Sequence, residues 1–460
     1  MLLLAVYSLS QWSLMCEMTR RLKANGRAVG VIWTGSASAP AAQVAREQAE
    51  ALGANFILRE SFNRPAKTSL RQPQWRERMP WFKPEPDALP PDHPYRELVR
   101  RQIGGAQQLL DRYSAQALLV CEDGPGGDNA LIAVARARRL PVLVVPFGVG
   151  ESHDYDVFLD DKHREGNLNF VPIGALGNYI RRHASHWIRP TTYGDVLMFP
   201  AEFLAARMLE GLDIPQPWVV HGGLANKLAV ESPAMARHYR REGIPPRKLV
   251  HTGTVYCDTV YDALQSDPAY TQAHRTCSRI RADRTSLLIS LPPSYHAQRA
   301  SFCEHPTYEA MCESVMNLCA SIPGLDCTVS VHPNSSDAAR QALLSTGATV
   351  TEEWLVSLIP RHDLFLTTFS STIRWAVAAH KPVLNYDLYG FGLPTYVGLP
   401  GVQTHRDFEQ LSRALRLMCR DNEAYHHASR AQAAVAAEWG TLDGKNFQRL
   451  LACIDRMCAA

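Results

Sequence analysis

The chain has 460 residues, of which 46% are hydrophobic and 20% are charged, a composition typical of a globular protein with an ample core. Its length suggests two or three domains. The net charge of +3 and the isoelectric point near 8.3 are too mild to indicate a surface that binds nucleic acid.

The eleven cysteines are scattered, without CxxC pairs or the spacing of metal ligands. We therefore expect no disulfide framework, no metal site and a cytoplasmic location. The first residues, MLLLAVYSLSQW, lack the basic start and the cleavage site of a signal peptide, so they favour a buried first strand. No apolar run approaches the ~18 residues of a membrane helix, which predicts no transmembrane segment and leaves peripheral membrane association open.

Apolar runs alternate with amphipathic helical patterns along the first half of the chain. Such alternation predicts parallel strands that are buried on both faces and joined by helices. The helical patterns include SAPAAQVAREQAEALGA and DNALIAVARARRL. The runs expected to form strands are residues 2–7, 29–33, 55–58, 117–121, 142–146, 218–221 and 227–230.

The alternation breaks between residues 61 and 98, where the chain is rich in proline, arginine and aromatic residues. An insertion of this length with little regular pattern is either a functional lid or a disordered loop. As a lid, its segment near residues 75–82 would clamp an acceptor molecule.

A second α/β series begins at Ser286, after a polar helical stretch. Two such series predict an α/β protein with two Rossmann-like domains that face each other across a cleft, in a GT-B-like arrangement. The predicted domains are residues 1–264 and 286–430, followed by a C-terminal helix over 431–460. The strands expected in the second series are residues 286–292, 326–333, 348–353, 363–369 and 382–387.

A hydroxyl-rich turn lies in the stretch DLFLTTFSSTIRWAVAAH, where Ser370, Ser371 and Thr372 connect a strand to a helix. Ligands of an open parallel sheet bind beyond the carboxyl ends of its strands, and the free N–H groups of a helix start attract anions. The turn is therefore a candidate site for the phosphates of a donor. The alternative is plain N-capping of the helix, a role that Ser and Thr favour.

Three further strand ends of the second half carry polar residues. His332 follows the run VSV and is a candidate catalytic acid or phosphate ligand. Ser294 and His296 lie in the loop SLPPSYHAQR, and Asp387 follows PVLNY. Each residue alone has a structural alternative, but their convergence on one sheet edge favours a site that binds a donor nucleotide.

The first half has acidic residues at the matching positions. Glu122 and Asp123 follow the buried run LLVC, and a glycine-rich turn separates them from Asp128 at a helix start. Carboxylates repel phosphate and suit a general base, so Glu122 and Asp123 are catalytic candidates, whereas Asp128 fits an N-cap. His153 and Asp154, after the next strand, are candidates for binding an acceptor, with a solvated loop as the alternative.

Three stretches resemble segments of GT-B-fold glycosyltransferases that build bacterial surface polysaccharides. LAVESPAMARHYRREGIPPRKLVHTGTVYCD is similar to the segment that closes their N-terminal domain, whereas VHP at 331–333 and TTFSSTIRWAVAAHKPVLNYD are similar to donor-site segments. The likeness is to the CDP-glycerol glycerophosphotransferase, CMP-Kdo and CMP-sialic-acid transferase groups, and UDP-GlcNAc 2-epimerases share the architecture. The resemblance implies that the donor nucleotide is contacted by His332, Ser370, Ser371 and Thr372.

These observations favour a glycosyltransferase that moves a sugar from a CMP-, CDP- or UDP-linked donor to a hydroxyl of a surface glycan or glycoconjugate. His332 and the turn hydroxyls would neutralise the leaving phosphate, and Glu122 or Asp123 would take the acceptor proton. No cofactor is expected. Two alternatives remain: a nucleotide-sugar 2-epimerase, and a non-catalytic two-lobed protein that binds nucleotides or sugars.

Overall fold

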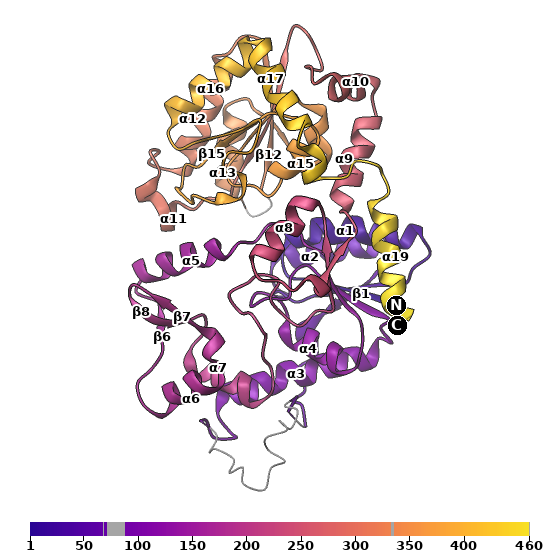
Figure 1. Ribbon diagram of the computed structural model, residues 1–460, viewed down its shortest axis with the longest axis vertical. Coiled ribbons are helices and arrows are strands. Elements are labelled where there is room, and N and C mark those ends of the chain that lie inside the picture. Colours follow the sequence, from indigo (N-terminus) through magenta and orange to yellow (C-terminus); the bar gives the residue numbers. More distant parts are fainter. Residues whose placement is uncertain (68, 71–87, 333–334, 460) are drawn as a thin grey trace. The chain divides into compact units, whose positions relative to one another are not determined.

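The computed structural model describes residues 1–67, 69–70, 88–332 and 335–459. The segment 75–82, predicted to clamp an acceptor, lies outside the described residues. The chain forms two compact units, each of mixed α/β structure (Figure 1). Unit 1 comprises Met1–Ala229, Tyr239–Val250 and Ala452–Ala460, and unit 2 comprises Val230–His238 and His251–Leu451.

Unit 1 is built on a seven-stranded sheet with the strand order β10-β9-β5-β4-β1-β2-β3. The central pairs are parallel, with Leu4 in register with Val31 on one side and with Leu119 on the other. These strands are runs of buried aliphatic residues because helices cover both faces of the sheet. The strands are β1 (Leu2–Val6), β2 (Val29–Trp33), β3 (Asn55–Leu58), β4 (Ala117–Val120), β5 (Val142–Val144), β9 (Lys227–Val230) and β10 (Leu249–His251).

The helices of unit 1 connect these strands. α1 packs against α2, and α3 packs against α4 and α7 (Figure 1). A small antiparallel sheet, in the order β6-β8-β7, is inserted before α7. The elements are α1 (Leu9–Ala24), α2 (Pro40–Ala51), α3 (Pro94–Arg112), α4 (Asn129–Ala137), α5 (Ser152–Arg164), β6 (Asn169–Phe170), α6 (Ala175–His183), β7 (Ile188–Thr191), β8 (Gly194–Leu197) and α7 (Ala201–Leu209).

Unit 2 repeats this plan with a six-stranded sheet in the order β13-β12-β11-β14-β15-β16. All its neighbouring strands run parallel. Its strands are β11 (Thr285–Leu291), β12 (Leu325–Val331), β13 (Thr349–Thr351), β14 (Leu364–Thr367), β15 (Val383–Tyr386) and β16 (Val402–His405). Its helices are α9 (Val255–Gln265), α10 (Pro268–Thr276), α11 (His296–Arg299), α12 (Tyr308–Ala320), α13 (Asp337–Ser345), α14 (Leu355–Leu358), α15 (Ile373–Ala378), α16 (Phe408–Arg420), α17 (Asn422–Ala433) and α18 (Ala436–Trp439).

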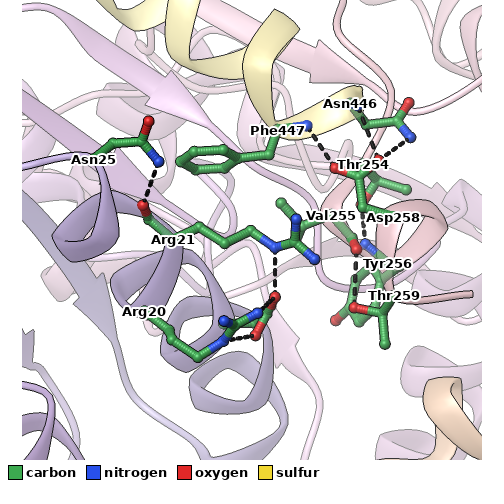
Figure 2. Close-up of polar contacts among 11 residues, drawn as sticks. Arg20, Arg21, Asn25, Thr254, Val255, Tyr256, Asp258, Thr259, Asn446 and Phe447 are labelled. Atoms are coloured by element: carbon green, nitrogen blue, oxygen red, sulfur yellow. Dashed lines mark hydrogen bonds and ion pairs between the residues drawn. The ribbon is translucent and has the colours of Figure 1, made fainter. Parts of the chain in front are cut away.

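Two helices, α8 (Pro233–Arg241) and α19 (Asn446–Ala459), contain residues of both units. The start of α19 is fixed within unit 2 by the fully buried Asp258 of α9. The Asp258 carboxylate accepts hydrogen bonds from the backbone N–H groups of Asn446 (2.9 Å) and Phe447 (2.7 Å), as Figure 2 shows. A carboxylate at this position satisfies N–H groups that the helix itself leaves unpaired.

Each sheet has one topological switch point, where the strand order reverses. In unit 1 the chain leaves β1 toward β2 and β3 but places β4 and β5 on the other side. In unit 2 the corresponding neighbours are β11 and β14. Open parallel sheets bind ligands at the carboxyl ends of these strands, so each switch point is a candidate ligand site.

The strand predictions are confirmed except at residues 218–221, which form a turn. The two valines there have their carbonyls engaged in loop contacts, since Gly222 donates to Val219 (2.9 Å) and Gly124 donates to Val220 (2.9 Å). Flanking prolines and glycines favour such turns, and they outweigh the β propensity of Val-Val. The sequence also missed β10, β16 and the small sheet, which are strands of only two to four residues.

None of the helices in the described ranges is long and apolar enough to cross a bilayer.

Candidate functional site

The switch point of unit 1 brings Tyr7 and Glu122 together. Tyr7 directly follows β1, and Glu122 follows β4 after one intervening residue. The two strands are neighbours in the sheet, where Ala5 pairs with Val120. The Tyr7 hydroxyl donates a hydrogen bond of 2.9 Å to Glu122 Oε1. The pair thus occupies the position at which ligands of this fold class bind.

Glu122 has the electrostatics of a general base. Burial raises the pKa of its carboxyl, the neighbouring charge of Asp123 adds to this effect, and the hydrogen bond from Tyr7 opposes it. Burial also raises the pKa of Tyr7, which therefore keeps its proton and acts as a donor. A carboxyl with a raised pKa binds a proton more readily at neutral pH than an ordinary glutamate does.

A glycine makes room for the Glu122 carboxyl. A Cβ atom added at Gly126 would lie 2.5 Å from Glu122 Oε1, closer than any real contact. The glycine-rich turn after β4 therefore leaves space where a larger residue would displace the carboxylate.

Asp123, the next residue, is in a different environment. Its side chain is fully buried, and Oδ2 accepts hydrogen bonds from Lys248 Nζ (2.7 Å) and from the N–H of Ala225 (2.8 Å). Lys248 also donates to the carbonyls of His221 (2.7 Å) and Gly223 (2.9 Å). These bonds join the end of β4 to the loop 221–225, so the geometry gives Asp123 a structural function and leaves Glu122 as the stronger catalytic candidate.

Asp128 is the N-cap of α4, as predicted. Its Oδ1 accepts from the N–H of Leu131 (2.9 Å), and its Oδ2 pairs with Arg59 (2.7 Å). The second contact ties α4 to the end of β3, which holds the turn beside Glu122 in place.

A cavity of about 720 Å³ opens at this edge of the unit 1 sheet. It is lined by loops that follow β1 to β4 and by residues around α7. Its wall is partly aromatic and partly polar, a mixture typical of small-molecule sites. The lining residues include Tyr7, Gly126, Phe199, Phe203 and Arg207.

His153 and Asp154, the predicted acceptor ligands, lie in the first turn of α5. Asp154 Oδ2 accepts from the N–H of Glu151 (2.9 Å), so one carboxylate oxygen is engaged in a capping box. Burial raises the pKa of Asp154. Among the described residues, those that line the 720 Å³ cavity include neither of them, nor Glu122, although Glu122 contacts the lining residues Tyr7 and Gly126.

In unit 2 the sequence-predicted donor residues follow four neighbouring strands at one edge of the sheet. Ser294 and His296 come after β11, and the turn that ends in α15 comes after β14, so these flank the switch point. His332 follows β12, and Asp387 follows β15. The convergence that the sequence predicts is therefore present in the topology.

The hydroxyls of the turn bond to one another rather than acting as a simple cap. Ser370 Oγ lies 2.6 Å from Thr372 Oγ1 and accepts from the N–H of Thr372 (3.2 Å). Thr372 is the N-cap residue of α15, yet its side chain makes no capping bond. Phe369 has a φ of 40°, and its N–H donates to Asn385 Oδ1 (3.0 Å), which holds the turn in this left-handed conformation.

α15 has six residues, so its helix dipole is a minor contribution. The donors that an anion would meet here are therefore mainly the hydroxyls of Ser370, Ser371 and Thr372. His332 adds an imidazole at the same sheet edge, where burial lowers its pKa and keeps the ring neutral at neutral pH.

Asp387 is engaged within its own loop, whereas His296 joins the loop after β11 to the loop after β15. His296 Nδ1 lies 2.8 Å from the hydroxyl of Tyr389, and Nε2 lies 3.2 Å from the carbonyl of His305. The Asp387 carboxylate accepts from the N–H groups of Phe391 (2.8 Å) and Gly392 (3.0 Å). Both side chains thus shape the loops of the edge, and Ser294 Oγ does the same by accepting from the N–H of His296 (3.4 Å).

Two residues of the unit 1 site were missed by sequence reasoning. Tyr7 directly follows the first strand, so the strand-end rule could have identified it. Arg207 is a cation within the apolar helix AEFLAARML, and a charge in such a helix is an unusual signal. Nothing in the sequence pattern places Arg207 next to the end of β4.

No protein-family model matches this chain, and no curated protein matches it in sequence. Its structure is similar to that of S. aureus MnaA with UDP, with a TM-score of 0.53 and 14% identity over 99% of this chain and 95% of that one. It is also similar to the UDP-GlcNAc 2-epimerase from Neisseria meningitidis bound to UDP-GlcNAc, with a TM-score of 0.52 and 13% identity over 99% of this chain and 100% of that one. These identities bear on the fold alone. The chain has a fold of two Rossmann-like domains of the GT-B type.

Proposed function

We propose that this protein is a glycosyltransferase that moves a sugar from a nucleotide-sugar donor to an acceptor hydroxyl. The observation that carries the proposal is the hydrogen-bonded Glu122–Tyr7 pair at the unit 1 switch point, beside a cavity of about 720 Å³. An inverting transferase needs an acceptor site with a base, and the cavity together with the raised pKa of Glu122 supports this assignment. Nucleotide-sugar ligands are further supported by the similar structures, which hold UDP or UDP-GlcNAc.

The reaction assigns separate tasks to the two units. Glu122 takes the proton of the acceptor hydroxyl, whose oxygen attacks the anomeric carbon of the donor sugar. The bond from that carbon to the phosphate oxygen breaks, and the nucleotide leaves with the electron pair. Ser371, Thr372 and His332 donate hydrogen bonds to the phosphate oxygens, where negative charge grows in the transition state.

Tyr7 is a positioning residue in this scheme. Its hydrogen bond fixes the rotamer of Glu122 and leaves the second carboxylate oxygen to meet the acceptor. The bond also moderates the rise in pKa of Glu122, so the carboxylate form stays accessible near neutral pH.

A nucleotide-sugar 2-epimerase is the second candidate, because enzymes of that activity share the fold. An epimerase acts on the donor alone and needs no separate acceptor cavity. The cavity beside Tyr7 therefore favours transfer.

The test is a panel of CMP-, CDP-, UDP- and GDP-linked sugars, each incubated with and without a mixture of glycan acceptors. Release of free nucleotide that requires an acceptor supports transfer, and the Glu122→Gln variant should lose it. An isomerised donor in the absence of acceptor would show an epimerase instead. Binding of a nucleotide sugar without turnover under any condition would show the non-catalytic alternative.

A further inference from the structure

Arg207 is a buried cation in the wall of the 720 Å³ cavity of unit 1. It lies in α7, and its side chain is 4% exposed. Three aromatic rings surround the guanidinium: Trp187 at 5.4 Å, Phe199 at 5.9 Å and Phe203 at 5.8 Å. Such rings orient a cation through their π faces but do not neutralise its charge.

The hydrogen bonding of Arg207 is incomplete. A guanidinium has five N–H groups, and one of them, on Nη2, donates to Asn129 Oδ1 (2.9 Å). Within the described part of the chain, Nε has no hydrogen-bond partner and no carboxylate lies within ion-pair distance. Burial lowers the pKa of Arg207 to about 10, so the charge persists at neutral pH. A buried guanidinium that forms no ion pair within the described residues is costly, and a bound anion would lower that cost.

The carboxylate of Asp213 raises the pKa of Arg207 but forms its hydrogen bonds with other groups. Asp213 Oδ1 accepts from His186 Nε2 (2.9 Å), Trp187 Nε1 (2.9 Å) and the N–H of Ile214 (2.7 Å). All three donors meet Oδ1 and hold Asp213 in its own loop, where its charge offsets only part of the effect of burial on the pKa of Arg207.

The other two arginines of the cavity already have anionic partners. Arg59 pairs with Asp128 (2.7 Å) and donates to the carbonyls of Phe62 (3.0 Å) and Gln102 (2.7 Å). Arg101 pairs with Glu97 at 2.5 Å. Arg207 therefore differs from these two arginines, because no described residue forms an ion pair with it.

We propose that this cavity binds the anionic group of the acceptor, a carboxylate or a phosphate, and that Arg207 recognises it. The identification of the ligand as the acceptor rests on the function proposed above. Its negative charge is inferred from Arg207 alone. The rings of Phe199 and Phe203 provide apolar surface against which the carbon face of a sugar or polyol packs. The acceptor class is thus an acidic sugar or a phosphorylated alcohol, with its hydroxyl directed to Glu122.

The test is equilibrium binding by calorimetry in the absence of donor, so it requires no turnover. Two pairs of probes differ in charge: methyl glucuronide against methyl glucoside, and glycerol 3-phosphate against glycerol. The wild-type protein should bind the charged member of at least one pair about tenfold or more tightly, because a hydrogen-bonded charge pair is worth roughly a decade in affinity. The carboxylate and phosphate pairs distinguish the two chemical sources.

The Arg207→Gln variant should lose this preference, whereas Arg101→Gln, which removes a cavity arginine that has its own partner, should largely keep it. Arg207→Lys retains the charge, so comparing it with Arg207→Gln separates the loss of the charge from misfolding of the Gln variant. Equal affinity of the wild type for charged and neutral probes, or an unchanged preference in Arg207→Gln, would overturn the inference. Normal turnover of Glu122→Gln together with a lost preference in Arg207→Gln would instead refute the proposed base and leave this inference intact.

Discussion

The two switch points have the same topology but opposite chemistry. The edge of unit 1 carries two ionisable groups that form no ion pair with any residue the structure describes: the carboxyl of Glu122 with its raised pKa and the buried guanidinium of Arg207. Apart from the Asp387 carboxylate, which accepts from two loop N–H groups, the edge of unit 2 carries neutral hydroxyls bonded to each other and a neutral His332. Uncompensated buried charges suit acid–base chemistry and the recognition of ions, whereas neutral donors suit a guest that brings its own charge.

The same contrast exists between adjacent residues of unit 1. Glu122 and Asp123 are sequence neighbours, yet Asp123 is neutralised by Lys248 at 2.7 Å and Glu122 has a tyrosine hydroxyl as its partner. A carboxylate paired with a buried lysine stabilises the fold, and one without a counter-ion remains available to a substrate.

Replacing Glu122 by Gln should give the largest change in activity. We expect kcat to fall by about 10²- to 10⁴-fold, because the amide cannot take a proton while it still accepts from Tyr7. Steady-state release of nucleotide from the donor that supports transfer measures this. Glu50→Gln, which alters an exposed carboxylate of α2 that does not line the cavity, is the control and should leave kcat within about twofold. An unchanged kcat in Glu122→Gln would show that Glu122 is not the base of the reaction.

Replacing Asp123 by Ala should give the largest change in stability. The free energy of unfolding should fall by about 3–5 kcal/mol, since Lys248 would remain buried without its counter-ion. Chemical denaturation in urea measures the loss. If Asp123→Ala unfolds at the same urea concentration as the wild type, Asp123 does not have the structural function that distinguishes it from Glu122.

The hydroxyl turn should respond more modestly. Ser371→Ala should weaken the binding of the preferred nucleotide by about tenfold, because a hydrogen bond to a charged phosphate is lost. His332→Ala should give a similar effect. Thermal-shift titration with CMP, CDP, UDP and GDP selects the nucleotide and measures its affinity. Ser345→Ala, an exposed hydroxyl at the end of α13, is the control. Unchanged affinity in both site variants would show that the donor phosphates bind elsewhere.

The smallest expected effect concerns the pH dependence of stability. Because the folded-state pKa of Glu122 is raised above its ordinary value of about 4.3, the folded protein holds this proton more tightly than the unfolded chain does. Its contribution to stability is complete below about pH 4 and is lost as pH rises through the raised pKa. Gln does not titrate, so Glu122→Gln should become progressively more stable relative to the wild type as pH increases over this window.

Urea denaturation of both proteins across this pH series tests the sign of that shift. A difference that moves in the opposite direction would mean that the pKa of Glu122 is lowered in the folded state, and that the carboxylate has a cationic partner.

The sequence was informative where the signal is local. Buried runs such as residues 117–121 and 286–292 predicted the strands, and the strand-end rule then placed Glu122, Ser294 and Ser370 at the edges of two sheets. The run at 218–221 failed because the prolines and glycines around it favour a turn. Short strands such as β10 and β16 carry too little periodicity to be recognised.

The partners of the site residues could not be predicted, because they are distant in sequence. Lys248 reaches Asp123 across 125 positions, and Tyr7 reaches Glu122 across 115. Burial and pairing decide which of two adjacent carboxylates is structural, and both depend on tertiary packing. The same holds for Arg207, whose exceptional environment arises from rings and an asparagine on other elements.

The central claim is that Glu122 activates an acceptor hydroxyl for transfer of the donor sugar. The most direct measurement follows a donor that carries an isotopic label at its anomeric carbon, by NMR, in a single turnover with acceptor present. The account predicts that the label appears in a new glycosidic bond to the acceptor, that the nucleotide is released in equal amount, and that Glu122→Gln slows both together. Label that stays attached to the nucleotide in an isomerised sugar would contradict the account.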